Sequence, residues 1–234
     1  MTSTPLSLLD ELAPRSRDRL LARSVERVLA PGDFLHMAGD QPERVHLIEA
    51  GVLKLTARDT EGEETIVGLA LPGETVGEIA ALDGTGHPTD CSAATRSRVA
   101  GLDAGLFLEV LGSDPAGALA LARMLAGRLR WCSEAAMERA ASEVPARLAG
   151  RLLDLARMLG DRSGSGIDVE MPLAQADLGR LAGMCRESAC KTLRRFRRDG
   201  LVDYSGRKLR ILRPDALEHI RCAGRNRSGR AERA

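Results

Sequence analysis

Glycine residues divide the chain between residues 30 and 103 into short apolar runs, and this punctuation restricts the possible folds most strongly. Runs such as Val45–Ile48 and Val52–Leu55 lie between glycines or Pro-Gly pairs that recur about every ten residues. Short strands separated by turn signals at this spacing are typical of an antiparallel sandwich or barrel. We therefore predict an all-β domain over this stretch.

The pattern changes to that of a long helix after residue 112. Asp114-Pro115 is a typical helix start, and the next proline is Pro145. Apolar residues recur here at the steps of a coiled-coil seam, namely Leu121, Leu125, Leu129, Cys132 and Ala136. The helix would be about 40 Å long, more than a small β-domain needs. We predict that residues 113–143 form a dimerisation helix; the alternative is a helix that packs only on its own β-domain.

The third part of the sequence has the pattern of a winged helix-turn-helix. A second amphipathic helix, residues 146–159, and a Gly/Ser loop at 163–166 lead to a short helix, residues 175–182. A tight turn at 183–185 and a helix at 186–199 follow, and residues 201–212 form a hairpin with a glycine turn. We assign residues 144–222 to this domain and predict that the small, polar and basic residues 223–234 are disordered.

Charge is distributed unevenly along the chain. The overall net charge is +1, but residues 186–234 contain 15 Lys and Arg against six Asp and Glu, a net charge of +9. Such asymmetry indicates a polyanion-binding end, although a solvated basic tail would give part of it.

The helix at 186–199 has a face suited to reading DNA. At 100° per residue, Ala189, Thr192, Leu193 and Phe196 share one side and must pack on the preceding helix. The residues available for DNA are Arg186, Glu187, Ser188, Cys190, Lys191 and Arg194, with Lys208 on the wing. Arg and Lys donate to guanine, and Glu accepts from cytosine. An acidic side chain among these basic residues is expected if the helix contacts nucleobase edges, and is not expected if it binds phosphates alone. The alternative is an exposed, salt-bridged helix.

These motifs together resemble the Crp/Fnr superfamily of transcription regulators. The resemblance extends from about residue 30 to residue 217. It rests on the order of Pro31-Gly32-Asp33, Ile48–Leu55, Leu71–Glu74 leading into Gly77-Glu78-Ile79, Glu143–Arg147 and Leu178–Gly183 followed by Arg186-Glu187-Ser188. It implies an α+β fold with an N-terminal antiparallel β-roll in residues 1–112, including an N-terminal helical segment. It also implies a homodimer that binds a palindromic operator and works with RNA polymerase, and Arg186, Glu187 and Lys191 as its base-reading residues.

The resemblance also indicates an effector region in the β-roll. Its members would be Gly77, Glu78, Ile79, His87, Pro88, Cys132 and Ser133. His87-Pro88 stands where the cAMP-binding branch has an Arg-Ser pair that holds the cyclic phosphate. A histidine forms at most one such contact, and proline has no N–H to donate. We therefore expect an effector other than cAMP, or none; a cyclic-nucleotide effector is the alternative.

Other sensing chemistry finds less support in the sequence. The iron–sulfur cluster of the Fnr branch needs N-terminal cysteines, and none of the five cysteines precedes Cys91. We expect no metal site, and haem stays only an alternative, because the four histidines are scattered and a lone histidine is more often a surface residue than a haem ligand. A thiol response at Cys132 or Cys190 stays an alternative, but such cysteines are more often inert.

Two rival classes and the compartment complete the sequence predictions. An enzyme would have to use Cys91 as nucleophile with His87 as base. These two residues are near each other only in the sequence, which is no evidence of catalytic geometry, so we expect no enzymatic activity. A cyclic-nucleotide module that acts by protein contact alone leaves Glu187 among the basic residues unexplained.

No apolar run reaches the roughly 20 residues of a membrane span, and the cysteines form no CxxC pair. We therefore expect a cytoplasmic protein without membrane contact.

Overall fold

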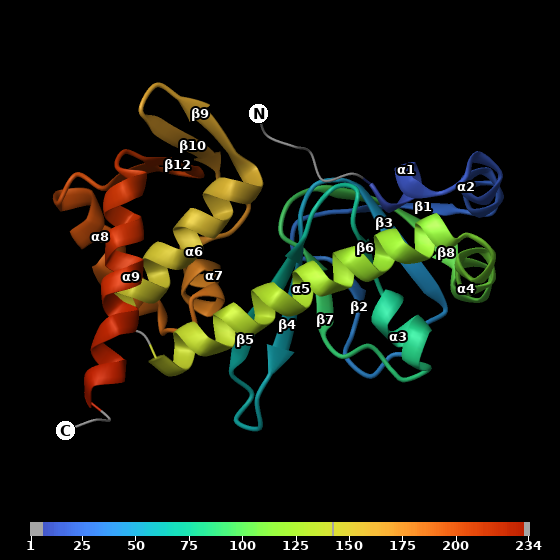
Figure 1. Ribbon diagram of the computed structural model, residues 1–234, viewed down its shortest axis with the longest axis horizontal. Helices are drawn as coiled ribbons and strands as arrows, with labels where there is room; N and C mark the ends of the chain where they lie inside the picture. Colours follow the sequence, from blue (N-terminus) through green and yellow to red (C-terminus); the bar gives the residue numbers. More distant parts are fainter. Residues whose placement is uncertain (1–6, 142, 232–234) are drawn as a thin grey trace. The chain divides into compact units, whose positions relative to one another are not determined.

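The computed structural model describes residues 7–141 and 143–231. These residues form two compact units whose boundary falls between Trp131 and Cys132. The long helix α5 (Pro115–Ala141) begins in the first unit and ends in the second (Figure 1). Its start is fixed by Asp114, whose carboxylate accepts hydrogen bonds from the backbone N–H groups of Ala13 at 2.8 Å and Gly117 at 3.1 Å.

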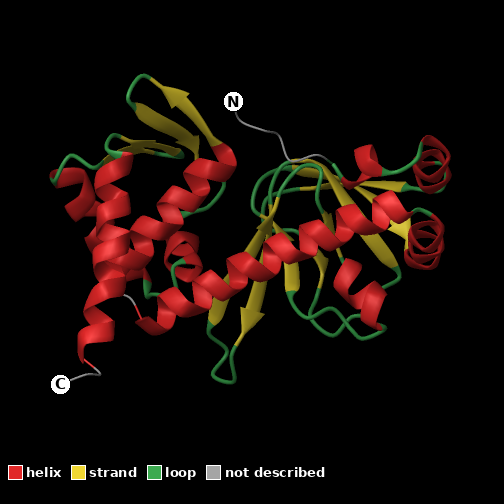
Figure 2. Ribbon diagram, in the orientation of Figure 1, coloured by secondary structure: helices red, strands yellow, loops and turns green. Residues whose placement is uncertain are grey.

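The first unit is built on two antiparallel sheets (Figure 2). One sheet has the strand order β1-β8-β3-β6 and the other β2-β7-β4-β5. The strands are β1 (Val25–Leu29), β2 (Phe34–His36), β3 (Arg44–Ala50), β4 (Leu53–Arg58), β5 (Glu64–Ala70), β6 (Thr75–Val76), β7 (Asp90–Ala93) and β8 (Ser97–Asp103). The helices are α1 (Leu8–Glu11), α2 (Pro14–Leu21), α3 (Glu78–Asp83) and α4 (Ala104–Ser113), with the first part of α5.

Alternation along the strands gives this unit two apolar clusters. Successive side chains of a strand point to opposite faces, so Leu47 and Ile48 of β3 enter different clusters. Ile48 packs with Leu53 and Cys91 of the other sheet, in the interior of the sandwich. Leu47 packs with Phe107 of α4 on the outer face, where helices cover the sheet.

The second unit contains the end of α5 and a helix-turn-helix with its wing. Its helices are α6 (Val144–Leu159), α7 (Gln175–Leu181), α8 (Arg186–Arg198) and α9 (Pro214–Ala231). Its strands are β9 (Gly160–Ser163), β10 (Gly166–Glu170), β11 (Val202–Ser205) and β12 (Lys208–Ile211), which form one antiparallel sheet in the order β11-β12-β10-β9. Helix α9 packs along α6 (Figure 2).

The predicted fold class is confirmed, and three local predictions need correction. Helix α3 interrupts the stretch that we predicted to be all β, and α4 follows it unpredicted. The predicted Gly/Ser loop at 163–166 is the turn of the β9–β10 hairpin. Residues 223–231 continue α9, whereas a disordered tail was predicted from residue 223; residues 232–234 lie outside the described residues.

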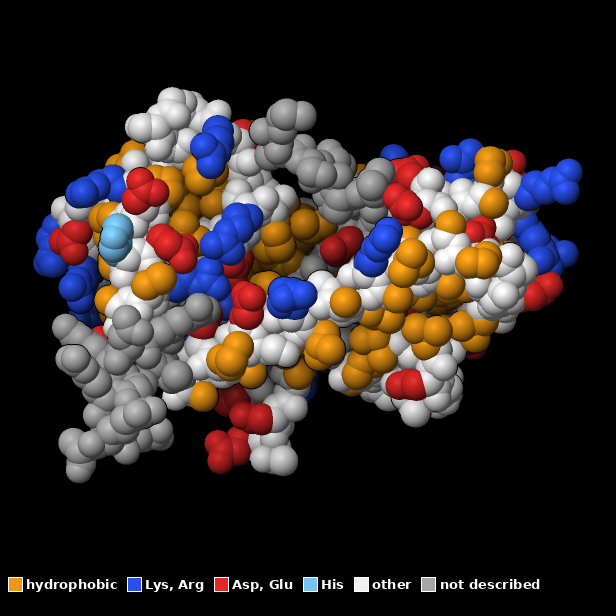
Figure 3. Space-filling model, viewed as in Figure 1, with side chains coloured by type: hydrophobic (Ala, Val, Ile, Leu, Met, Phe, Trp, Pro, Cys, Tyr) orange, Lys and Arg blue, Asp and Glu red, His pale blue; other side chains and the backbone are white. Residues whose placement is uncertain are grey.

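The composition of the predicted seam on α5 is also corrected. Leu121 is buried, and Leu125 packs against the same cluster, so both belong to the core of their own unit. Leu129, Cys132 and Ala136 are exposed, as a seam requires. Leu129 and Ala136 belong to an exposed stripe whose members follow one another at alternating steps of three and four residues. The stripe consists of Leu119, Ala122, Ala126, Leu129, Ser133, Ala136 and Ala140. Figure 3 shows exposed apolar side chains along α5.

No single helix among the described residues has both the length and the apolarity that a bilayer span needs. Helices α4 and α5 meet these criteria only as a pair, with a bend of 113° between them.

Candidate nucleic-acid interface and effector region

The two helices of the helix-turn-helix approach closely because glycines occupy two positions between them. Gly183 has a φ of +61°, a left-handed conformation that favours glycine, and lies in the turn between α7 and α8. A Cβ at Gly179 of α7 would lie 3.0 Å from the backbone oxygen of Met184 and 3.4 Å from Cβ of Ala189. The backbone N–H of Met184 donates to the oxygen of Gly179 at 3.0 Å, which closes the turn.

The packing face of α8 is confirmed by the structure. Its buried residues are Ala189, Thr192, Leu193 and Phe196, the four that helical periodicity predicted. Because these residues face the interior, the opposite side of the helix is presented outward. Arg186, Glu187, Lys191 and Arg194 are exposed, whereas Ser188 and Cys190 are half-buried.

The arginines and lysines of this region fall into two groups by their ion pairs. Arg195 and Arg198 pair with Asp199 at 3.5 and 3.4 Å, and Arg197 pairs with Asp203 at 3.0 Å. Each of these three charges is therefore partly neutralised within its own domain. A second group, on the first two-thirds of α8 and on the wing, has no ion pair with another described residue: Arg186, Lys191, Arg194 and Lys208.

The wing presents Lys208 at a hairpin turn. Gly206, with a φ of +58°, forms the turn, and Lys208 pairs with Ser205 across the hairpin. Arg210, two residues along the strand, instead pairs with Asp168 at 3.5 Å. Of Lys208 and Arg210 on this strand, Lys208 is thus the one free of an ion pair with the described residues.

An open cleft of about 580 Å³ lies beside the exposed face of α8. Val144 and Pro145 of α6 form one side, and Lys191, Arg194 and Arg198 lie on the other. The sequence predicted the α8 residues but not that the start of α6 adjoins them. No local signal could reveal this, because the contact depends on how α6 and α8 pack.

Cys185 is a further feature of the turn that the sequence did not single out. It is exposed, occupies the N-cap of α8, and its Sγ lies 3.2 Å from Oγ of Ser188. This hydrogen bond and the backbone N–H of Ser188 lower the pKa of the Cys185 thiol. Cys190 is half-buried, with its Sγ 3.7 Å from Oε1 of Gln175.

In the first unit, Glu78 is held by a partner that the sequence did not predict. The Glu78 side chain is 1% exposed and pairs through Oε1 with Nη1 of Arg128 on α5. Nη2 of Arg128 donates to the backbone oxygen of Thr75 at 2.5 Å and lies 3.7 Å from Oε2 of Glu74. Burial raises the pKa of Glu78, and the Arg128 charge opposes that rise only in part.

His87 is also engaged with another side chain. Its ring stacks on the ring of His36 with centroids 3.7 Å apart and an interplanar angle of 6°. Burial lowers the pKa of His87, and burial together with the neighbouring His87 and His46 lowers the pKa of His36 to about 3. Both rings are therefore neutral near pH 7.

The remaining residues predicted for the effector region differ in their exposure and in the unit to which they belong. Gly77, with a φ of +90°, lies against His87, since a Cβ there would be 3.2 Å from Cε1 of the ring. Ile79 and Pro88 are exposed. Cys132 and Ser133 are exposed on α5 in the second unit.

Two further predictions concern metals and nucleophiles. Among the described residues, no group of three or more His, Cys, Asp or Glu side chains could hold a metal ion. Cys91, the one nucleophile considered for an enzyme, is fully buried, and burial raises the pKa of its thiol to about 12. A thiolate is therefore strongly disfavoured at this position.

Comparison with known proteins gives two domain matches. Residues 26–114 match the model of the cyclic nucleotide-binding domain, and residues 146–220 match that of the Crp-like helix-turn-helix domain. The described helix-turn-helix and wing lie within the second range.

Relatives and solved structures cover most of the chain. The CRP-like cAMP-activated global transcriptional regulator of Mycobacterium tuberculosis (strain CDC 1551 / Oshkosh) is 26% identical over 193 residues, which is 80% of this chain and 86% of that protein. The fumarate and nitrate reduction regulatory protein of Escherichia coli (strain K12) is 24% identical over 211 residues, covering 90% and 82%. The structure of FixK2 from Bradyrhizobium japonicum has a TM-score of 0.75 at 20% identity, covers 84% of this chain and 96% of its own, and shows the shared fold.

The buried Glu78–Arg128 pair predicts a pH-dependent loss of stability. In Arg128→Met, the Glu78 carboxylate would be buried without its partner, and we expect a loss of about 3 kcal/mol or more in unfolding free energy at pH 8. The folded-state pKa of Glu78 is already raised and would rise further. Its protonation therefore relieves the loss at low pH, and the loss returns as pH increases above the ordinary carboxyl pKa. Urea unfolding at pH 5 and pH 8 measures the difference.

The matched control for this prediction is the double variant Arg128→Met/Glu78→Gln. It removes both charges, so its loss of stability should be smaller and nearly independent of pH. An Arg128→Met variant with equal losses at both pH values would contradict this account of the pair.

Proposed function

Because this chain belongs to the Crp/Fnr superfamily of transcription regulators, we propose that it is a homodimer that binds a palindromic DNA operator through α8. The observation that carries the proposal is the division of charges on that helix. Arg186, Lys191 and Arg194 are exposed without ion pairs to the described residues, whereas Arg195, Arg197 and Arg198 are paired with acids of their own domain. Of the unpaired group, Arg186 and Lys191 lie in the N-terminal half of α8, the end that helix-turn-helix proteins insert into the major groove.

The chemistry of these side chains favours a half-site that contains G·C pairs. Arg186 and Lys191 would donate to O6 and N7 of guanine, and Glu187 would accept from N4 of cytosine. Ser188 and Cys190 lie at the edge of the same face, and Arg194 and Lys208 would contact phosphates, which position the protein and make binding salt-dependent. Contact with RNA polymerase at the promoter is part of the same proposal.

Dimerisation is supported by the exposed stripe on α5. Its members recur at three- and four-residue steps over about six turns of the helix, and small residues predominate among them. Leu119 and Leu129 within the stripe are 51% and 69% exposed, and Met137 beside it is 61% exposed. Burying these side chains against a second copy of α5 would remove them from water.

For the effector, the geometry favours a ligand other than cAMP. At the position of the phosphate-binding Arg-Ser pair, this chain has a neutral His87 stacked on His36, and Pro88, which has no N–H. Glu78, the match for the ribose-binding residue, is paired with Arg128. The alternative is a cyclic-nucleotide effector. It is favoured by the relative from Mycobacterium tuberculosis, whose name describes it as cAMP-activated, and the cAMP titration below decides between the two.

The first prediction concerns base reading. Arg186→Ala and Lys191→Ala should each weaken binding to the specific operator by about 1–3 kcal/mol, since each removes donors to a guanine. Arg197→Ala is the control, because Arg197 is paired with Asp203 and should change specific binding little. Fluorescence anisotropy on an operator selected from random duplexes gives the affinities. Unchanged affinities and footprints in both variants would refute the assignment.

The second prediction concerns the dimer. Leu129→Glu places a charge in the middle of the stripe, so the variant should shift in light-scattering mass toward the 25.1 kDa of a single chain. Leu108→Glu makes the same exchange at an exposed leucine of α4 and should leave the mass unchanged. A wild-type protein that is monomeric at micromolar concentration would rule out the homodimer.

The third prediction concerns cAMP. Titration calorimetry should show weak or absent binding to the wild-type protein, because charge-assisted contacts worth roughly 1.5–3 kcal/mol each are missing. The double variant His87→Arg/Pro88→Ser restores both donors and should bind cAMP about tenfold more tightly or better. A submicromolar Kd for the wild-type protein would instead establish the cyclic-nucleotide alternative.

A further inference from the structure

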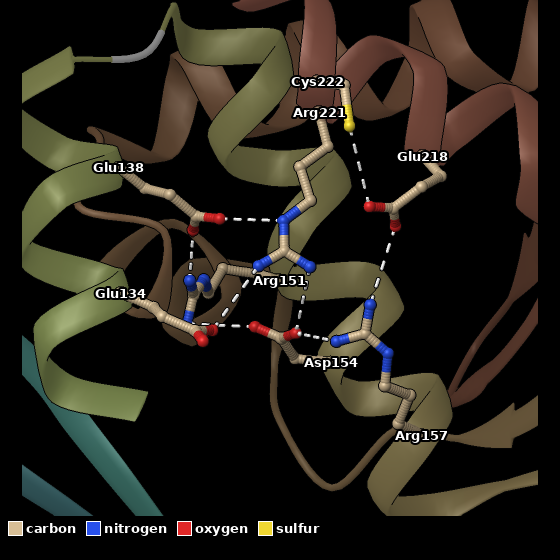
Figure 4. Close-up of polar contacts among 8 residues, drawn as sticks. All are labelled: Glu134, Glu138, Arg151, Asp154, Arg157, Glu218, Arg221 and Cys222. Atoms are coloured by element: carbon tan, nitrogen blue, oxygen red, sulfur yellow. Dashed lines mark hydrogen bonds and ion pairs between the residues drawn. The ribbon is translucent and has the colours of Figure 1, made fainter. Parts of the chain in front are cut away.

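A buried ion-pair network joins the last turns of α5 to the helix-turn-helix unit. The Glu138 side chain on α5 is 4% exposed, and both of its oxygens are engaged (Figure 4). Oε2 pairs with Nη2 of Arg151 on α6, and Oε1 accepts from Nε of Arg221 on α9 at 2.8 Å. One carboxylate of α5 is thus held from two helices at once.

The charges inside this network balance. Arg151 also pairs with Asp154 at 3.1 Å, and Arg221 lies 3.7 Å from the same carboxyl group. Two acids and two bases are therefore buried together. The outer members, Glu134 and Arg157, are more exposed.

Gly150 of α6 lacks a side chain at the position where the Glu138 carboxylate lies. A Cβ at Gly150 would lie 3.3 Å from each oxygen of Glu138 and 3.4 Å from Nε of Arg221. The carboxylate therefore lies directly on the backbone of α6. Both Glu138 and Arg221 fall outside the two ranges that match domain models, so the network belongs to the parts of the chain that those models do not describe.

We infer that Glu138 is a positioning residue that fixes the end of the dimer helix on the DNA-binding domain and thereby sets the distance between the two reading helices. This inference rests on the proposed function. Helix α5 ends at Ala141 and α6 begins at Val144, so the helical hydrogen bonds do not continue from one to the other. A directional polar network has one arrangement in which all its charges are paired, whereas an apolar contact can slide.

The consequence of this arrangement is a preference for one operator geometry. Half-site spacing on DNA mirrors the separation of the reading helices in the dimer. If Glu138 fixes α5 on the domain, the wild-type protein should prefer one spacing over operators one or two base pairs longer or shorter, by about tenfold. Loss of the network should remove this preference and leave the contact of each domain with its own half-site intact.

The test uses the double variant Glu138→Gln/Arg221→Met, which detaches α5 and leaves Arg151 and Asp154 as a balanced pair. Operators are built from the half-site that the full-length protein selects, at five spacings, together with a single half-site. We expect the spacing preference to fall to less than about threefold while single-half-site affinity stays within about twofold of the wild-type value. Glu134→Gln is the matched control on the same helix, because Glu134 lies 3.8 Å from Arg221 but is 42% exposed, and it should keep the full preference.

A second variant leaves all charges in place. Gly150→Ala puts a methyl group against the Glu138 oxygens and should weaken the spacing preference in the same direction. Either a double variant with the wild-type preference, or one that loses half-site and full-site binding in parallel, overturns the inference. A wild-type protein that binds a paired operator no better than a single half-site would overturn the proposed dimeric function, and the inference with it.

Discussion

Helix α5 must satisfy two environments along two neighbouring faces, and much of the molecule depends on that requirement. On one face Leu121 and Leu125 complete the core of the first unit, and Arg128 reaches the buried Glu78. On the other face a stripe of small and apolar residues stays exposed. At its end, Glu138 joins the helix to the second unit. Helix α5 thus contributes residues to the core of the first unit, to the proposed dimer contact and to the ion-pair network of the second unit.

Local periodicity predicted the features that depend on a single helix or hairpin. The packing face of α8 follows from residues three and four apart, and the wing follows from a glycine turn between two short apolar runs. The same reasoning failed on α5, because periodicity identifies an apolar stripe but not the partner that covers it. Leu121 and Leu125 were assigned to the seam although they are core residues. The C-terminal end of α9 was missed because its small polar residues have no apolar repeat.

Long-range polar contacts could not be predicted from the sequence. Glu78 and Arg128 are 50 residues apart, and Glu138 and Arg221 are 83 apart. Each pair consists of ordinary charged residues that would be solvated if the chain did not bring them together. The histidines are a similar case, since the ring centroids of His36 and His87 lie 3.7 Å apart although the two residues are 51 positions apart in the sequence. The sequence singled out His87 but gave no indication of its stacking partner.

The strand order of the small sheet has a consequence for how the wing meets a ligand. Strand β12 lies between β11 and β10, so Lys208 at its start is registered with Ser205 on one side and with Glu170 on the other. The backbone at Lys208 is therefore paired with a neighbouring strand on each side, and only its side chain is free to change conformation when it contacts a ligand. A basic residue on such a rigid strand loses little backbone entropy when it binds a ligand. A basic residue on an isolated, fluctuating hairpin would lose more.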